Sequence, residues 1–447
     1  MGALINMLRS ANTNRSEPPE SVFAATMQMP NALTEQPHSM TFAYVTVWLF
    51  TLVYFARPGD WIALPFAQIV GVFVILAFLG SLLSGVLPAL WWSWDVVLLL
   101  LLFAQICLAV PFGIWPGASF QVAEEFAKII VITLAIIVAS NSLARLRRLI
   151  YIQTAAVMIM AVLVATGYGG SLQGAAGSRT VGIVGGVFQN PNDLALAIAL
   201  IFPFAFAFAV RADKLVWKLV WMVAMLVATY TCMTTYSRSG LLALLAAATI
   251  SFWEFVMKGR RLSWALLVVP GVALILVASP SGLGQRMVSI FQPDADVTGS
   301  SQQRREILIR SLEVTAENPL VGVGPGNFPI VSGMWKVTHN SYTQLSAEAG
   351  LPALFLFLLL GRCSFSNLRR ARQLDPNNQE LVMWAGSLQA SLAALAVGAL
   401  FSSIAFHYFP YFLIGYTGAL YRLSYSDCLA RRPVSDPSFC ETPQPAS

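Results

Sequence analysis

The chain has 447 residues, of which 57% are hydrophobic and only 11% are charged, and its mean hydropathy is +0.68. Soluble proteins average about 45–50% apolar and about 25% charged residues, so the composition excludes a water-soluble globular protein. The formal net charge is +6, and the positions of the basic residues decide whether it indicates a partner.

The first 40 residues are polar and contain no apolar run of the kind that a signal peptide needs. We expect a disordered cytoplasmic tail there. From Met40 onward apolar runs recur, and a helix needs about 20 such residues to cross a bilayer. The sequence therefore predicts an all-α, polytopic membrane protein with about twelve spans. These are residues 41–56, 61–83, 95–111, 127–140, 149–166, 190–210, 215–236, 239–257, 262–279, 342–361, 381–401 and 403–421.

This organisation divides the chain into five parts. A cytoplasmic tail over 1–40 precedes nine transmembrane helices in 41–279, and a long periplasmic loop that contains a helix occupies 280–341. Three further transmembrane helices lie in 342–421, and a cytoplasmic C-terminal tail covers 422–447.

Basic residues set the expected orientation, because loops rich in Lys and Arg stay cytoplasmic. With the N-terminus inside, 18 of the 27 basic residues lie on the cytoplasmic side. Most of the positive charge is then a topology signal at the inner leaflet, and no nucleic-acid partner is expected. The remaining nine lie on the outer side and either snorkel to headgroups or serve a function. They are Arg57, Lys128, Arg179, Arg238, Arg286, Arg304, Arg305, Arg310 and Lys336.

The outer connection from Ser279 to Ser341 is far longer than most connections, so it is a candidate functional segment. Ser300 or Ser301 can cap a helix through residues 302–317. The glycines of 319–329 allow a tight backbone path that packs against the bilayer surface or admits a ligand closely. A D-x-D pair at 294–296 is interpreted as a solvated turn, because nucleotide sugars are absent from the outer face.

His339 lies just before another predicted helix at the membrane surface. Asn340 is suited to be the N-cap of a helix over 341–349, which Gly350 breaks. An imidazole with a pKa near 6.5, beside several arginines, is suited to be a general base. A structural role for His339 is equally compatible with the sequence.

Two shorter outer connections carry further arginines. We expect 167–186 to form a glycine-rich re-entrant or surface loop that contains Arg179, followed by Asn192 at the mouth of the sixth span. The connection at 234–240 places Arg238 at the outer headgroups. With Arg304 or Arg305, these arginines would form a cluster that grips a di-anion, because guanidinium is permanently charged and bidentate.

Motifs in these segments resemble the O-antigen ligase and polymerase superfamily of bacterial membrane glycosyltransferases. They are SRSG at 237–240, R-x14-P-L-x-G-x-G from Arg304 to Gly324, H-N-x9-G from His339 to Gly350, and the Asn-Pro-Asn segment at 190–192. The chain departs from the pattern at Ala353 and at Leu308. The second departure leaves the choice between Arg304 and Arg305 open.

The resemblance implies a multi-pass enzyme of the bacterial inner membrane with its active site facing the periplasm. Such enzymes transfer a glycan from undecaprenyl diphosphate to an acceptor hydroxyl, with inversion and without a metal or other cofactor. By matched position, His339 would deprotonate the acceptor, and Arg238 and Arg304 would bind the diphosphate and stabilise its charge. Substrate-binding roles would fall to Arg305, Arg179, Asn192 and Asn340.

Alternatives remain at this stage. A ligase uses lipid A core as acceptor in lipopolysaccharide assembly, whereas a polymerase uses a second carrier-linked glycan, and the sequence does not distinguish them. A 12-helix transporter or lipid flippase is an alternative of another class. It would need charged residues at mid-span, yet Lys218, Glu254 and Glu348 lie near the ends of the predicted spans.

Overall fold

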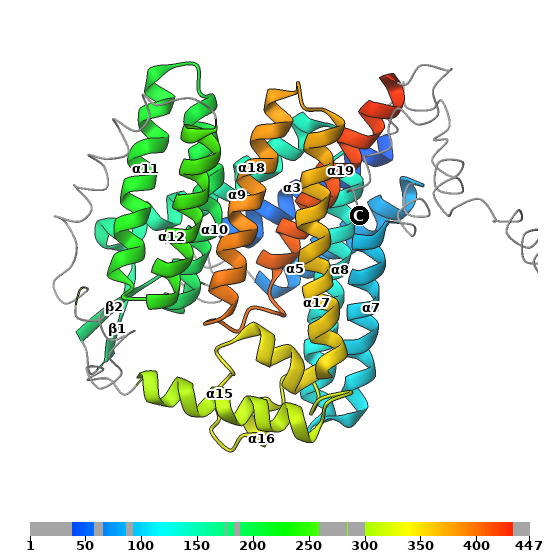
Figure 1. Ribbon diagram of the computed structural model, residues 1–447, viewed down its shortest axis with the longest axis vertical. Coiled ribbons are helices and arrows are strands. Elements are labelled where there is room, and N and C mark those ends of the chain that lie inside the picture. Colours follow the sequence, from blue (N-terminus) through cyan, green and yellow to red (C-terminus); the bar gives the residue numbers. More distant parts are fainter. Residues whose placement is uncertain are drawn as a thin grey trace, which may run out of the picture.

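The structure, a computed structural model, describes residues 38–57, 66–85, 93–174, 177–182, 188–258 and 300–431, together with Gly284. The described part of the chain is mostly helical (Figure 1). The predicted ninth span at 262–279, the D-x-D pair and nearly all of the predicted N-terminal tail lie outside the described residues.

The helices of the first half run along a common bundle, with one hairpin between them. They are α3 (His38–Ala56), α5 (Phe66–Leu83), α7 (Trp94–Ala109), the 3₁₀ turn η2 (Val110–Phe112), α8 (Pro116–Ala139), α9 (Leu143–Leu163) and the π-helix η3 (Val164–Tyr168). Strands β1 (Gly170–Gly174) and β2 (Gly177–Val181) follow, and then α10 (Pro191–Arg211), α11 (Leu215–Thr234), α12 (Arg238–Phe252) and the π-helix η5 (Trp253–Met257).

The second half places two helices across one end of this bundle before the chain returns to it. These are α15 (Ser300–Glu317) and the short α16 (Phe328–Val331). The chain then continues through α17 (Ser341–Leu374), α18 (Gln379–Ala399) and α19 (Tyr408–Arg431).

Seven helical segments of the described chain are long and apolar enough to cross a membrane, judged by length and composition. They are Trp94–Phe112, Leu143–Tyr168, Pro191–Arg211, Leu215–Thr234, Arg238–Met257, Ser341–Leu374 and Gln379–Ala399. The protein is therefore a multi-pass membrane protein. Helices α3, α5, α8 and α19 coincide with four more of the predicted spans, and their crossing remains a prediction.

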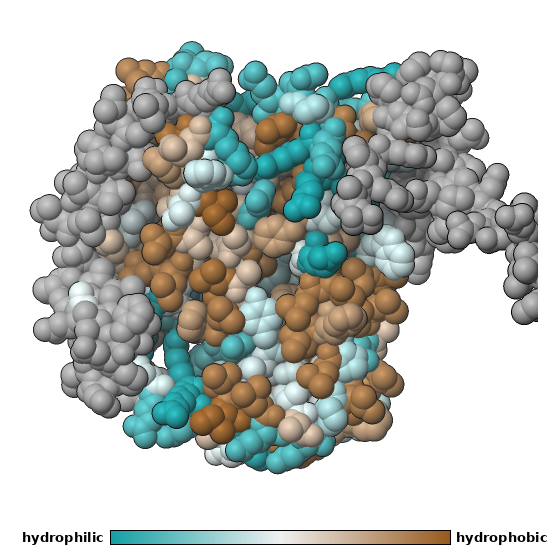
Figure 2. All heavy atoms as spheres, in the orientation of Figure 1, coloured by the Kyte–Doolittle hydropathy of each residue, from teal (hydrophilic) through white to brown (hydrophobic). Residues whose placement is uncertain are grey.

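The two ends of the bundle differ in character (Figure 1). One end carries α15, α16 and the β1–β2 hairpin, and is called the α15 end below. The other carries the α10–α11 and α17–α18 connections and the end of α19, with Arg211, Lys214, Arg372 and Arg431, and is called the basic end. Figure 2 shows hydrophobic side chains over the middle of the visible face and hydrophilic ones towards both ends.

Helix α10 lies at the centre of one half of the bundle, and 83% of its 18-residue apolar stretch is buried inside the protein. It packs against α9, α11, α12 and α18. Gly240 permits the contact with α12, because a Cβ at this position would lie 2.2 Å from the Cβ of Ala195. This close approach fixes the start of α12, where Arg238 is located.

The structure departs from the expected organisation in three places. The segment expected as a glycine-rich loop forms an antiparallel hairpin, in which Ser171 pairs with Thr180; pairing with itself satisfies its backbone groups. Helix α19 continues to Arg431, so the first ten residues of the predicted C-terminal tail are helical. Helix α8 begins at Pro116, well before the predicted fourth span, because charged Glu124 and Glu125 interrupt its apolar pattern but not its helix.

A candidate active site at the α15 end

Arg238 stands at the first position of α12, where the sequence builds a capped helix start. The Oγ of Ser237 accepts a hydrogen bond from the backbone N–H of Gly240 at 3.2 Å. The preceding Tyr236 has a φ of +51°, so the chain turns sharply between α11 and α12. From this position Arg238 donates from Nη1 to the Oγ of Ser301 in the first turn of α15, at 2.8 Å. The arginine therefore joins the bundle to the helix that crosses its end.

Arg179, on β2, is held beside the same turn. Its Nε donates to the carbonyl oxygen of Thr235 at 2.9 Å, and its Nη2 donates to the Oδ1 of Asn192 at 3.0 Å. The Oδ1 of Asn190 caps α10 by accepting from the backbone N–H of Asn192. This cap fixes the backbone from which the side chain of Asn192 reaches Arg179. The hairpin, the end of α11 and the start of α10 thus meet at one guanidinium group.

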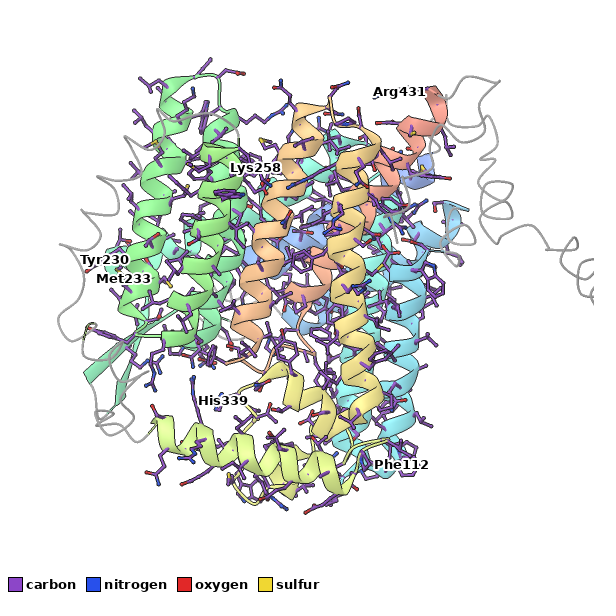
Figure 3. All side chains as sticks on the ribbon, viewed as in Figure 1. Phe112, Tyr230, Met233, Lys258, His339 and Arg431 are labelled. Carbon is purple, nitrogen blue, oxygen red and sulfur yellow. The ribbon has the colours of Figure 1, made fainter. Side chains whose placement is uncertain are left out.

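His339 lies between α15 and the ends of the bundle helices (Figure 3). Its φ is +51°, a left-handed conformation that is rare for a side chain with a Cβ. The chain just after His339 is anchored by the hydroxyl of Ser341, whose Oγ donates to the carbonyl of Ser402 at 2.6 Å and accepts from the N–H of Ile404 at 2.9 Å. Strained conformations of this kind persist only where the surroundings over-determine them, as they often do at functional sites.

The environment of His339 keeps its imidazole neutral. Burial lowers the pKa of His339 to about 4, and the charges of Arg304 and Lys336 act in the same direction. At neutral pH the side chain therefore has a free lone pair that can accept a proton.

The structure separates Arg304 from Arg305. Arg304 is partly buried and its charge acts on His339, whereas Arg305 is exposed. Arg304 lies three residues after Ser301, so it stands one turn along α15 from the partner of Arg238. The two arginines and the imidazole thus occupy the same corner of the molecule.

Asn340 fulfils the capping role expected from the sequence. Its Oδ1 accepts from the N–H groups of Tyr342 and Thr343, at 2.9 and 3.2 Å. The helix bends at Gly350, whose φ is +84°, and continues as the long part of α17. The predicted helix and its break are confirmed. The Oδ1 of Asn340, the atom that would accept a hydrogen bond from a substrate, is already used by this cap.

Two glycines of the loop 319–329 lie in close contact with other parts of the protein, and packing against the bilayer surface or a ligand stays a prediction. A Cβ on Gly322 would lie 2.4 Å from the carbonyl carbon of Glu348, and one on Gly324 would lie 2.5 Å from the Cα of Gly113. The N–H of Val323 donates to the carbonyl of Ala347 at 2.9 Å. The glycines therefore allow the loop to seat the first turns of α17, which follow His339.

Three supporting groups were missed from the sequence. Gln105 of α7 donates from Nε2 to the carbonyls of Leu320 and Ala349, at 2.8 and 2.9 Å, beside the Gly350 bend. The sequence signal for Gln105 was a polar side chain within an otherwise apolar run. Ser301 was expected only as a candidate helix cap and not as a partner of Arg238, and Lys336, three residues before His339, was counted only among the outer basic residues.

These positive and polar groups suit an anionic ligand. Among the described residues, no three His, Cys, Asp or Glu side chains form a group that could hold a metal ion. Asp294 and Asp296 lie outside the described part of the chain.

Residues 222–358 match the family model of the O-antigen ligase. This stretch of the chain is similar to the O-antigen ligase family. The resemblance drawn from the sequence motifs is thereby confirmed, and Arg238, Arg304 and His339 all lie inside the matched range. No curated protein matches the chain. The matched range begins within α11 and ends within α17, so it contains α12, α15 and the turn that carries His339.

Proposed function

We propose that this protein is a membrane glycosyltransferase of the O-antigen ligase type. It transfers a glycan from undecaprenyl diphosphate to a hydroxyl of lipid A core, and the α15 end faces the periplasm of the bacterial inner membrane. The observation that carries the proposal is the partly buried imidazole of His339, on which the charge of Arg304 acts, with Arg238 bound to the same helix as Arg304. A base beside permanent cations suits attack by an alcohol on a phosphate-activated sugar.

In the proposed reaction His339 takes the proton of the acceptor hydroxyl. The hydroxyl oxygen then attacks the anomeric carbon, and the bond from that carbon to the diphosphate oxygen breaks. Attack opposite the leaving group inverts the anomeric centre. The diphosphate leaves with its electron pair, and Arg238 and Arg304 stabilise the charge that develops on it.

Arg179 and Asn192 act as positioning residues in this proposal. Arg179 binds the carbonyl of Thr235, which lies three residues before Arg238. Asn192 in turn holds Arg179. The pair therefore sets the turn from which Arg238 reaches the diphosphate.

The orientation agrees with the charges at the basic end. Arg147, Arg211, Lys214 and Arg372 lie there, and positively charged connections remain cytoplasmic. The α15 end, with α15 lying across it, then faces the periplasm, where the carrier-linked glycans of such enzymes are presented.

Deletion of the gene tests the choice of acceptor. If the protein is a ligase, the deletion strain should lose long glycan from lipid A core and accumulate carrier-linked polymer. Accumulation of single carrier-linked repeat units would instead assign the protein as a polymerase of the same superfamily.

Reconstitution tests the site itself. Purified protein with undecaprenyl-diphosphate glycan and lipid A core should transfer glycan, and Arg304→Ala should reduce kcat about 10²–10³-fold, the range for removal of one charge-stabilising group. Arg310→Ala is the matched control, because Arg310 lies on the same helix but pairs with Glu313 at 3.0 Å. Equal activity of Arg304→Ala and Arg310→Ala would contradict the proposed role of Arg304.

A further inference from the structure

A cavity at the basic end lies far along the bundle from the candidate active site. It has a volume of about 360 Å³ and opens between α9, α10 and α11. Its walls include Arg147, Arg148, Tyr151, Arg211, Trp217 and Trp221. The α10–α11 connection, at the top of Figure 1, forms one edge.

The charges at this cavity are not balanced. Arg147 and Arg211 share one carboxylate, that of Glu380 on α18, at 2.8 and 2.9 Å. Asp213 is the acidic residue of the lining, while Arg148, which also forms a hydrogen bond with the side chain of Tyr44 on α3, adds a third guanidinium group and is exposed. Three cations therefore face two acidic side chains, which leaves the cavity suited to an anion.

The remaining wall is aromatic. Trp221 stacks on Phe208 with ring centroids 5.1 Å apart, and Tyr151 packs edge-on against both. Trp217 is 54% exposed beside them. Trp and Tyr are enriched at the level of lipid headgroups, because each combines an apolar ring with a polar edge.

The cavity adjoins a surface that acyl chains would cover. Only 28% of the 18-residue apolar stretch of α11 is buried inside the protein. Leu215, Val216 and Leu219, which begin this helix, are 69%, 67% and 49% exposed. An anion with attached acyl chains would therefore place its charge among the arginines and its chains along α11.

We propose that this cavity binds the headgroup of an anionic phospholipid of the leaflet at the basic end. The phosphate contacts Arg148 and the outward edges of Arg147 and Arg211, and Trp217 packs against the glycerol region. Basic pockets between transmembrane helices are suited to such lipids. A bound lipid would link α9, α10 and α11 at the end remote from the O-antigen ligase chemistry.

The test uses the full chain, purified in a mild detergent and titrated with phosphatidylglycerol or phosphatidylcholine, with bound lipid counted by native mass spectrometry. We expect the wild type to retain phosphatidylglycerol in preference to phosphatidylcholine. Arg148→Gln should weaken this retention about fivefold, since one basic residue near an anionic headgroup contributes about that factor. Arg369→Gln, an exposed arginine of α17 at the same end, is the matched control and should retain the lipid.

Further variants and a competitor complete the design. Trp217→Ala should also weaken retention without changing the charge, which separates a specific cavity from general attraction to positive surface. Equal losses in Arg148→Gln and Arg369→Gln would overturn the proposal. Displacement of the lipid by millimolar inorganic phosphate would also overturn it, because it would assign the cavity to a free anion.

Discussion

Arg238 and Ser301 join α12 to α15 through a hydrogen bond of 2.8 Å between Nη1 and Oγ. The two residues are far apart in the sequence, and each belongs to the first turn of its helix. The contact brings the SRSG motif to the helix that carries Arg304. Two motifs that are separated along the chain therefore lie beside each other.

Removal of each partner of this contact should have different effects. Arg238→Ala should lower kcat for glycan transfer about 10²–10³-fold, because a charge that stabilises the leaving diphosphate is lost. Ser301→Ala removes only the hydroxyl that orients the guanidinium, so kcat should fall by about tenfold or less. Both are measured by initial rates with the purified variants. A larger loss in Ser301→Ala than in Arg238→Ala would argue against diphosphate binding by Arg238.

The bend at Gly350 should not tolerate a side chain. Its φ is +84°, and a Cβ there would lie 2.3 Å from the carbonyl oxygen of Leu320. Gly350→Ala should destabilise the protein by more than about 1 kcal/mol, seen as a lower temperature of thermal unfolding in detergent. Gly361→Ala, on the same helix with open space around it, is the control and should leave the unfolding temperature unchanged or raise it. Similar losses in both variants would contradict this account of the bend.

The pH dependence follows from the lowered pKa of His339. In the folded protein this pKa is about 4, against 6.5 in the unfolded chain. Between these values the unfolded state binds more protons, so the contribution of His339 to the free energy of unfolding rises from pH 4 to pH 6.5 and is constant above. The difference in unfolding free energy between wild type and His339→Gln should change over this window. A difference that does not vary between pH 4 and pH 6.5 would contradict the buried, neutral imidazole.

The same pKa sets the acidic limb of catalysis. On the acidic side, kcat/KM should begin to fall only well below pH 6.5, because the free enzyme keeps His339 unprotonated. The acidic fall of kcat should occur at a higher pH than that of kcat/KM, since a bound diphosphate favours the protonated imidazole. The two profiles are measured with the purified enzyme and its lipid-linked donor. Coincident limbs at pH 6.5 would argue against His339 as the base.

Chelation offers a further prediction. If arginines stabilise the leaving diphosphate, excess EDTA should leave the transfer rate unchanged. Strong inhibition that is reversed by Mg²⁺ would count against this role and would direct attention to Asp294 and Asp296.

Much of this arrangement could be predicted from the sequence, because lipid as a solvent imposes a simple pattern. Uncharged runs of about 20 residues predict helices, and eleven described helices coincide with predicted spans. Local signals also sufficed at Asn340 and Gly350, where a cap and a break depend on neighbouring residues. Helix α8 was predicted too short because a charged pattern at its start concealed a continuous helix.

Other features depend on contacts between distant segments, and these are not encoded locally. On α15, Leu308 and Leu312 are exposed, whereas Ile307 and Val314 are fully buried. The buried face is chosen by Val323, Phe328 and Ala347, which pack against it. Likewise, the sequence alone could not choose between Arg304 and Arg305, because only the position of α15 against the turn of His339 distinguishes them.

One measurement tests the central claim most directly: the initial rate of glycan transfer by purified His339→Ala, with undecaprenyl-diphosphate glycan as donor and lipid A core as acceptor. Size-exclusion elution and unfolding temperature, compared with those of the wild type, establish that the variant is folded. Loss of a positioned general base predicts a fall in kcat of about 10²–10⁴-fold. Transfer by this variant at the wild-type rate would contradict the assignment of His339 as the base.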